Sequence, residues 1–410
     1  GGAAARQGRS RKYGGDNMLA EYQRVCAMVD LDAVAYNMEQ MRQNLSPGTK
    51  MIGVIKTDAY GHGAVQIARE LERLDYVWGY AVATAEEAFI LRRTGLKKQI
   101  LLLGCAYPYH YEELICNDIQ LTVFREDSIE ELAACARRMK KSVRGHVKLE
   151  TGMSRIGVMP DESGLRFVEK ILHTEGLVPE GVYTHFARSD ESDKTTTRRQ
   201  LALFTDFTER IQTQLHYSFP IRHCSNSAGI VEFPEANMDA VRAGITLYGL
   251  WPSAEVSRDI IQLRPVLSLK THIVYIKEVP AGTQISYGGT YVTPERMRIA
   301  TIPVGYGDGY PRSLSNKGYV LIRGKKAPIL GRVCMDQFMV GLKDIPEAEE
   351  EDEVTLVGED NGARITMEEL GELSGRFNYE FVCGLGKRIP RVYWKGGRIT
   401  AAKDYCGDYR

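Results

Sequence analysis

The chain lacks a net charge of either sign, a long apolar run and any paired cysteine motif, and each absence excludes a class of protein. Its 53 basic residues balance its 53 acidic residues, whereas nucleic-acid-binding domains normally carry a basic excess. No apolar run approaches the roughly 20 residues that a membrane helix needs. The eight cysteines are scattered without a C-x-x-C pair, which argues against a zinc site or a disulfide framework. We therefore expect a cytoplasmic protein with reduced thiols, no metal site, no nucleic-acid partner and no membrane association.

The first residues, GGAAARQGRSRKYGGDN, contain arginines but no apolar core, so they do not resemble a signal peptide. We interpret residues 1–17 as a remnant of recombinant expression and Met18 as the native start. Neither a P-loop nor an internal repeat is present. A chain of 410 residues exceeds the size at which one core stops growing, which predicts two or three domains.

Eight short apolar runs alternate with helical segments between residue 51 and about residue 250. The runs are MIGVIK (51–56), WGYAVAT (78–84), QILLLG (99–104), IQLTVF (119–124), GHVKLE (145–150), GVYTHFA (181–187), IRHCSN (221–226) and MDAVRAGI (238–245). Helices are expected at 84–95, at 128–141 with Ser128 as the cap, and at 195–215, where apolar residues recur at three- and four-residue spacing. This alternation predicts a (β/α)8 barrel over residues 18–257, with a doubly wound open sheet as the alternative.

From residue 258 to residue 410 the pattern changes to short runs rich in Val, Ile, Tyr and Thr, punctuated by glycine and proline. Some of these runs alternate polar and apolar residues with period two. The second part of the chain is therefore predicted to be a mostly β domain.

Polar residues lie at or near the carboxyl ends of five predicted barrel strands, where this architecture builds active sites. They are Lys56, Lys148, His185, His223 and Arg242. A lysine at the base of a pocket can form a Schiff base with a carbonyl compound. The aldehyde cofactor pyridoxal phosphate also needs a phosphate cradle and a partner for its ring nitrogen. Arg242 could face that nitrogen and, as a permanent donor, would keep it unprotonated.

Two turns could hold the phosphate. Ser227 opens SNSAGI, a predicted strand-to-helix turn, and the segment RAGI offers the backbone N–H groups of Gly244 and Ile245. Free amides at such turns suit an anion.

Ten segments, read in order, resemble one family of enzymes. The segments are VDLDAVAYN, VIKTDAYGHG, ETGMSRIG, YTHFA, HCSNS, VRAGITLYGL, SYGGTY, PVGYGDGYPR, GRVCMDQ and RIPRVY, and the resemblance runs from about Tyr22 to Tyr393. The family is that of the alanine racemases, pyridoxal-phosphate enzymes that interconvert L- and D-alanine. The resemblance implies that the product D-alanine supplies bacterial cell-wall peptidoglycan.

The resemblance also implies a role for each matching residue. Lys56 would hold the cofactor as an internal aldimine and would be one catalytic base, and Tyr287 would be the other. The cofactor-binding residues would be Lys56, Tyr60, His185, His223, Ser227, Arg242, Gly244 and Ile245. The substrate-binding residues would be Arg155, Met335 and Tyr306, and Lys148 matches a position that is often carbamylated.

Racemisation needs one proton removed from one face of the substrate Cα and another returned on the opposite face, so two acid/base groups must flank it. In the family Tyr287, Tyr306 and Met335 would reach the active site of the neighbouring subunit. The resemblance therefore implies a homodimer whose sites are shared between the two chains.

One position departs from the family pattern, because Lys387 in GLGKRIPR stands where a tyrosine usually borders the substrate pocket. A serine racemase or broad-specificity racemase of the same family is the alternative that this change leaves open. A barrel-type pyridoxal-dependent decarboxylase and a non-catalytic carrier of pyridoxal phosphate are two further alternatives.

Overall fold

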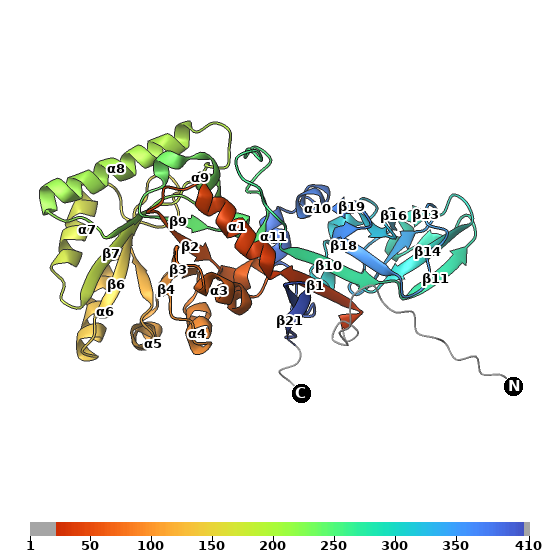
Figure 1. Ribbon diagram of the computed structural model, residues 1–410, viewed down its shortest axis with the longest axis horizontal. Coiled ribbons are helices and arrows are strands. Elements are labelled where there is room, and N and C mark those ends of the chain that lie inside the picture. Colours follow the sequence, from red (N-terminus) through yellow and green to blue (C-terminus); the bar gives the residue numbers. More distant parts are fainter. Residues whose placement is uncertain (1–21, 406–410) are drawn as a thin grey trace. The chain divides into compact units, whose positions relative to one another are not determined.

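The computed structural model describes residues 22–405 and divides the chain into two compact units (Figure 1). Within the described residues, the barrel unit contains residues 29–267 and 366–385, and the β-rich unit contains residues 22–28, 268–365 and 386–405. The predicted expression remnant, residues 1–17, lies outside the described residues. The division differs from the contiguous boundary expected at residue 257/258, since each unit is built from separate segments of the chain.

The barrel unit confirms the predicted (β/α)8 architecture and excludes the open sheet. Eight strands close on themselves in sequence order, and all neighbours run parallel. The strands are β2 (Lys50–Val54), β3 (Val77–Val82), β4 (Gln99–Leu102), β5 (Gln120–Val123), β6 (Val143–Lys148), β7 (Leu177–Tyr183), β8 (Ile221–His223) and β9 (Ala240–Ala243). Each overlaps one predicted apolar run, with ends displaced by up to four residues.

The helices of this unit lie outside the ring of strands (Figure 1). They are α1 (Leu31–Gln43), α3 (Ala64–Glu72), α4 (Ala85–Arg93), α5 (Tyr111–Cys116), α6 (Glu126–Arg138), α7 (Glu162–Leu172), α8 (Thr195–Leu215) and α9 (Ser227–Glu232), and the short α2 (Lys56–Tyr60) follows β2. Helix α8 has the predicted bounds. The predicted cap at Ser128 is wrong: α6 begins two residues earlier, and the Ser128 hydroxyl instead donates to the Arg125 carbonyl at 2.9 Å.

The β-rich unit contains a large sheet, which confirms the mostly β second domain. The strand order is β11-β14-β17-β16-β15-β18-β10-β1-β20-β21, with β19 paired to β18. Their bounds are β1 (Val25–Asp30), β10 (Leu267–His272), β11 (Tyr275–Val279), β14 (Met297–Ile302), β15 (Tyr319–Ile322), β16 (Lys325–Leu330), β17 (Phe338–Gly341), β18 (Glu353–Asp360), β19 (Ala363–Ile365), β20 (Arg391–Lys395) and β21 (Arg398–Lys403). A separate hairpin pairs β12 (Gln284–Ile285) with β13 (Tyr291–Val292).

Two helices from the carboxyl-terminal third of the chain belong to the barrel unit. They are α10 (Met367–Ser374) and α11 (Asn378–Cys383). The Glu368 carboxylate accepts from the Trp251 N–H at 3.1 Å, and the Asn378 amide donates to the Trp251 carbonyl at 2.9 Å. These two bonds fasten the segment to the loop that follows β9. In the described part of the chain, no helix is both long and apolar enough to cross a membrane.

Candidate active site

The five polar residues expected at the carboxyl ends of barrel strands all lie there. Lys148 ends β6 and His223 ends β8, while Arg242 lies within the last two residues of β9. Lys56 and His185 each follow the last residue of their strand by two positions. The closed barrel therefore gathers these side chains at one end of the unit.

The segment after Lys56 has an unusual backbone. Four consecutive residues other than glycine, Thr57 to Tyr60, have φ values of 54°, 52°, 54° and 51°. A left-handed turn of this kind costs roughly 1–2 kcal/mol per residue because Cβ approaches the following carbonyl oxygen. Such strain persists only where surrounding contacts stabilise it, and it concentrates at functional sites.

Among the hydrogen bonds of this left-handed turn, three lie at its ends. The Thr57 N–H donates to the Glu87 carboxylate at 2.5 Å, and the Gly61 N–H donates to the Thr57 carbonyl at 3.0 Å. The Asp58 carboxylate accepts from the Ala64 N–H at 2.8 Å. The turn is thereby fastened at both ends, which fixes the backbone that carries Lys56.

Glu87 connects this turn to the next βα unit. Besides Thr57, its carboxylate accepts from the N–H groups of Ala83 at 2.8 Å and Thr84 at 3.2 Å. Thr84 and Glu87 form the capping box of α4. The capping pattern is visible in the sequence, but the hydrogen bond from the Thr57 N–H to Glu87 is not. Sequence reasoning therefore missed Glu87.

Arg242 is 4% exposed and makes five hydrogen bonds, none of them to a carboxylate within residues 22–405. Its Nη1 donates to His223 Nδ1 at 2.7 Å, and its Nη2 donates to His185 Nδ1 at 3.3 Å. The other acceptors are the carbonyls of His223, Thr184 and Cys224. These bonds leave the Nε–H without a partner in that part of the chain, so a buried cation remains with one donor to offer.

The two histidines beside Arg242 are held neutral. Burial lowers the pKa of His223 and of His185 well below the ordinary value, and the Arg242 charge lowers both further. Because a guanidinium can only donate, each ring must present a lone pair at Nδ1 and carry its proton at Nε2. The ring of Tyr183 stacks on His223 with centroids 4.6 Å apart, which fixes the plane of the imidazole.

The predicted phosphate turns converge on one hydroxyl group. Helix α9 begins at Ser227, and the Ser227 hydroxyl oxygen accepts from the Gly244 N–H at 3.0 Å and from the Thr246 hydroxyl at 2.8 Å. A Cβ added at Gly244 would lie 3.0 Å from Tyr60 Oη and 3.5 Å from Ser227 Oγ. Hydroxyl and amide groups thus surround a small space that a side chain at position 244 would narrow.

The two lysines of the site both have a lowered pKa. Burial lowers the pKa of Lys56, and the nearby Arg155 guanidinium lowers it further. Burial also lowers the pKa of Lys148 to about 8. The Lys148 ammonium donates to the carbonyls of Leu149 at 2.7 Å and Ile156 at 3.2 Å. Each amine therefore has a larger neutral, nucleophilic fraction than an exposed lysine.

Cys383 is a second residue that sequence reasoning missed. It ends α11 and lies close enough to Lys56 for each group to influence the pKa of the other, while burial raises the pKa of the thiol. The only sequence signal was the cysteine itself, in a segment whose attachment to the barrel was not foreseen.

The remaining predicted residues, Tyr287, Tyr306 and Met335, belong to the β-rich unit and project outward with 69%, 43% and 53% of their surface exposed. The loops of Tyr306 and Met335 are joined by backbone bonds, because the Tyr306 N–H donates to the Cys334 carbonyl at 3.0 Å and the Gly307 N–H donates to the Met335 carbonyl at 2.8 Å. The loop of Tyr287 is joined to the Met335 loop through the bond from the Ser286 hydroxyl to the Arg332 carbonyl. The three exposed side chains therefore come from connected loops.

A close approach of the backbone explains one glycine here. A Cβ at Gly305 would lie 2.3 Å from the Met335 carbonyl oxygen, so no other residue allows these two loops to meet. Ser286, which precedes Tyr287, has a φ of 64°, and its hydroxyl donates to the Arg332 carbonyl at 2.6 Å. Tyr287 is thus held on a constrained turn although its side chain is exposed.

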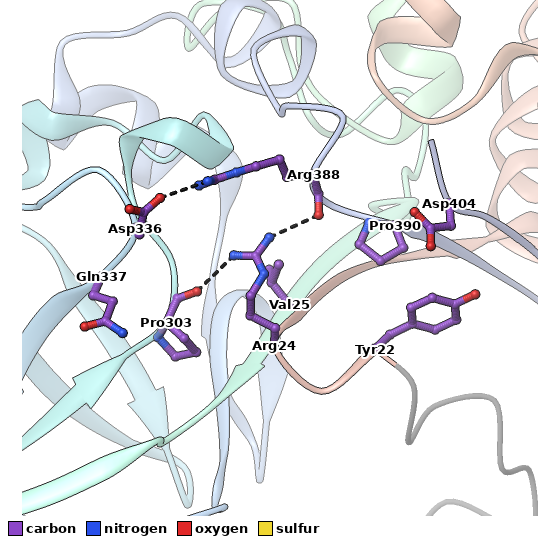
Figure 2. Close-up of a pocket in the computed structure, with 9 residues that line it drawn as sticks. All are labelled: Tyr22, Arg24, Val25, Pro303, Asp336, Gln337, Arg388, Pro390 and Asp404. Carbon is purple, nitrogen blue, oxygen red and sulfur yellow. Dashed lines mark hydrogen bonds and ion pairs between the residues drawn. The ribbon is translucent and has the colours of Figure 1, made fainter. Parts of the chain in front are cut away.

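The β-rich unit also contains a cavity of about 490 Å³ (Figure 2). Its arginines are engaged: Arg388 pairs with Asp336 at 2.8 Å, and Arg24 donates to the Pro303 carbonyl and to the Arg388 carbonyl, each at 3.0 Å. Arg24 and Arg388 both also pair with the buried Asp308. None of the predicted site residues lines this cavity.

Comparisons with known proteins agree on one family. Residues 29–252 match the model of the alanine racemase N-terminal domain, and residues 266–393 match that of the C-terminal domain. The chain is 45% identical over 369 residues to an alanine racemase of Desulforamulus reducens, which covers 90% of this chain and 98% of the relative. It is 40% identical over 393 residues to alanine racemase 1 of Clostridium acetobutylicum, covering 95% and 100%.

Solved structures give the same result. The structure of alanine racemase from Clostridium difficile is 36% identical with a TM-score of 0.88, covering 93% of this chain and 98% of that one. The Bacillus anthracis alanine racemase with bound L-Ala-P is 34% identical, also with a TM-score of 0.88, covering 94% and 99%.

Proposed function

The chain belongs to the alanine racemase family, whose members are isomerases that use pyridoxal phosphate, and on this premise we propose a two-base racemisation of alanine by Lys56 and Tyr287. The observation that supports this most is the buried Arg242, a cation whose five hydrogen bonds within residues 22–405 all go to neutral acceptors and whose Nε–H remains available as a donor. Such a group suits an electron-rich partner, here the ring nitrogen of the cofactor.

The residues at the carboxyl end of the barrel fit the cofactor. Lys56, whose pKa is lowered, would be the covalent anchor. The space bounded by Gly244, Tyr60 and Ser227 would take the phosphate, whose oxygens accept hydrogen bonds from hydroxyl and amide groups. Ile245, which starts the turn after Gly244, and His185, which contacts Arg242, would complete the cofactor-binding set.

Pyridoxal phosphate supplies, when bound, a carbonyl carbon for the substrate amino group and a conjugated ring that takes up the electron pair left at Cα. Lys56 Nζ would move a proton at the Cα on the D-alanine side. Tyr287 Oη would do the same on the opposite, L-alanine side.

Arg155 and the backbone N–H of Met335 would bind the substrate carboxylate, and Tyr306 would border it. A carbamylated Lys148 would supply an anion beside Arg155, and a pKa of about 8 supports this because carbamylation requires a neutral amine.

We further propose a homodimer in which Tyr287, Tyr306 and Met335 complete the site of the partner subunit. Their exposure on connected loops supports an interface, since exposed aromatic and methionine side chains are enriched where proteins associate. Supply of D-alanine for peptidoglycan and a cytoplasmic location stay predictions.

Subunit mixing tests both the two bases and their origin from different chains. Lys56→Ala and Tyr287→Phe homodimers should each be nearly inactive towards L-alanine. After dissociation and reassociation as a mixture, half of the dimers carry both variants, and one of their two sites has a native lysine and a native tyrosine. Activity should therefore return to roughly a quarter of the native value. No recovery in verified heterodimers, or full activity of Tyr287→Phe, contradicts the assignment.

The alternative is a serine or broad-specificity racemase of the same family, which Lys387 leaves open because this exposed residue stands where a tyrosine usually borders the pocket. The rates of D- and L-serine racemisation relative to alanine decide between them. We expect alanine to be faster, and a Lys387→Tyr variant to increase that preference. Release of carbon dioxide from either amino acid would instead indicate a decarboxylase.

A further inference from the structure

A continuous line of hydrogen-bonded side chains runs through the barrel interior away from Arg242. His223 Nε2 lies 2.9 Å from His146 Nδ1, and His146 Nε2 lies 2.7 Å from Gln120 Oε1. The Gln120 amide then donates to Gln99 Oε1 at 3.0 Å. We call His223, His146, Gln120 and Gln99 the relay. It reaches from the last residue of β8 to the first residues of β5 and β4.

The direction of every hydrogen bond in the relay follows from Arg242. Because the guanidinium only donates, His223 Nδ1 accepts, and the neutral ring carries its proton at Nε2. His223 therefore donates to His146 Nδ1, and His146 in turn carries its proton at Nε2 and donates to Gln120.

A second guanidinium imposes the same direction from the opposite end of the barrel. Arg144 donates to Gln99 Oε1 at 3.0 Å and to the Asp118 carboxylate at 2.7 Å. Gln99 Oε1 must then be an acceptor, so Gln120 turns its amide group toward Gln99 and its oxygen toward His146. Two permanent donors thus agree on one orientation, and a reversed ring or amide anywhere in the relay would place two donors face to face.

Three of the four relay residues are buried, and the adjacent strand leaves space for the His146 ring. His146 and His223 are fully buried and Gln120 is 1% exposed. A Cβ at Gly181 on the adjacent strand β7 would lie 2.3 Å from His146 Nδ1, so only glycine leaves room for the ring. Burial lowers the pKa of His146 to about 3, which keeps this ring neutral.

We propose that the relay holds His223 in the single tautomer that accepts from Arg242, and thereby fixes the direction in which the guanidinium presents its remaining donor. His146 and Gln120 are positioning residues that act through His223 and touch neither substrate nor cofactor. The proposal rests on the proposed function in one respect, the placement of the cofactor ring at Arg242.

The tautomers are tested directly by nitrogen-15 NMR of histidine-labelled holoenzyme. The chain has eight histidines, and His146→Asn and His223→Asn variants assign two of the ring spectra. Both rings should show a protonated Nε2 and an unprotonated Nδ1 between pH 6 and pH 8. A proton at Nδ1, or an imidazolium, on either ring overturns the proposal. The same measurement on cofactor-free protein does not depend on the placement of the cofactor, so failure of the proposed function is distinguished from failure of the relay.

A matched pair of substitutions tests the consequence. Asparagine and leucine have nearly the same shape, but asparagine offers an oxygen where His146 Nδ1 lies. His146→Leu removes the acceptor of the His223 proton, and we expect roughly 10- to 100-fold weaker cofactor binding, the effect of losing an oriented bond to a charged group. His146→Asn should restore binding to within about threefold of the native value. A red or blue shift of the cofactor absorbance should accompany the leucine variant alone.

Equal cofactor affinity and equal spectra in the two variants would mean that His146 only fills space, and would overturn the proposal. If the leucine variant does not fold, the asparagine variant and the NMR tautomers decide: native affinity with the expected tautomers supports the relay, and any other tautomer refutes it.

Discussion

Gly244→Ala tests the phosphate cradle with the smallest change that the chain allows. The added methyl carbon would lie 3.0 Å from Tyr60 Oη and 3.5 Å from Ser227 Oγ. The backbone at Gly244 has a φ of −106° and a ψ of −109°. This ψ lies outside the main regions that alanine adopts, so the substitution adds a backbone cost to the contact with Tyr60.

The Tyr60 ring cannot retreat easily from the new methyl group. It is 7% exposed and lies against Tyr248 and Tyr379, with ring centroids 4.8 Å and 6.0 Å away. Either the hydroxyl group shifts by a few tenths of an ångström or the phosphate is displaced. In both cases at least one hydrogen bond to a charged oxygen is lost, which is worth about 1.5–3 kcal/mol and corresponds to roughly 10- to 150-fold weaker cofactor binding.

The dissociation constant of pyridoxal phosphate, followed by absorbance, measures this effect. Gly48→Ala is the matched control, since a Cβ at this exposed turn would meet no atom within 4 Å. The control should bind the cofactor normally and unfold within about 1 kcal/mol of the native protein, and the unfolding transition of Gly244→Ala shows whether that variant is folded. Native affinity in a folded Gly244→Ala variant would refute the cradle.

Two further predictions concern the surroundings of the site. Glu87→Ala leaves the N–H groups of Thr57, Ala83 and Thr84 without their shared acceptor. It should lower the free energy of unfolding by about 1–3 kcal/mol and slow the borohydride labelling of Lys56. A labelling rate equal to that of the exposed control Glu86→Ala would contradict the role of the turn. The pKa values of His146, His185 and His223 are lowered in the folded protein, whereas in the unfolded chain these rings bind protons with a pKa near 6.5. Their effect on the free energy of unfolding is therefore absent above about pH 7.5. As the pH falls, the unfolded state binds more protons, and the folded protein loses at most about 1.4 kcal/mol of stability per pH unit for each ring. Urea unfolding between pH 7.5 and pH 5 should show this slope, and His146→Asn should reduce it; an unchanged slope in that variant would mean that His146 titrates normally in the folded protein.

The barrel was predictable because its signals are local. Buried parallel strands read as short apolar runs, and each of the eight runs overlaps a strand whose ends differ from the predicted ones by up to four residues. Helix α8 was predicted with its bounds because its apolar residues recur with the helical period over many turns. The cap at Ser128 failed because a serine also occupies the first turn of a helix, where its hydroxyl donates to a preceding carbonyl.

The features that were not predictable depend on contacts between distant segments. No propensity favours four left-handed residues in TDAY, and the turn exists because Glu87, from the next βα unit, accepts from its first N–H group. His146 sits within a run that reads correctly as a strand, and its partners come from two other strands. Helices α10 and α11 appear in sequence inside a β-rich region, and only the three-dimensional fold attaches them to the barrel.

The distribution of charge at the carboxyl end of the barrel explains why lysine and arginine occupy different positions there. Burial penalises every cation, but the two residue types respond differently. The amines of Lys56 and Lys148 can release their protons, and their lowered pKa values show that the site favours this. The guanidinium of Arg242 keeps its proton in proteins, so its charge is lessened only by acceptors that the fold or a ligand brings to it. Residues that must exchange protons or form bonds are therefore lysines, and the residue that must hold a fixed donor beside a neutral histidine is an arginine. The relay behind His223 follows from the position of Arg242. Because the buried guanidinium has no carboxylate partner within the described residues, the neighbouring imidazole rings must each present a lone pair to it.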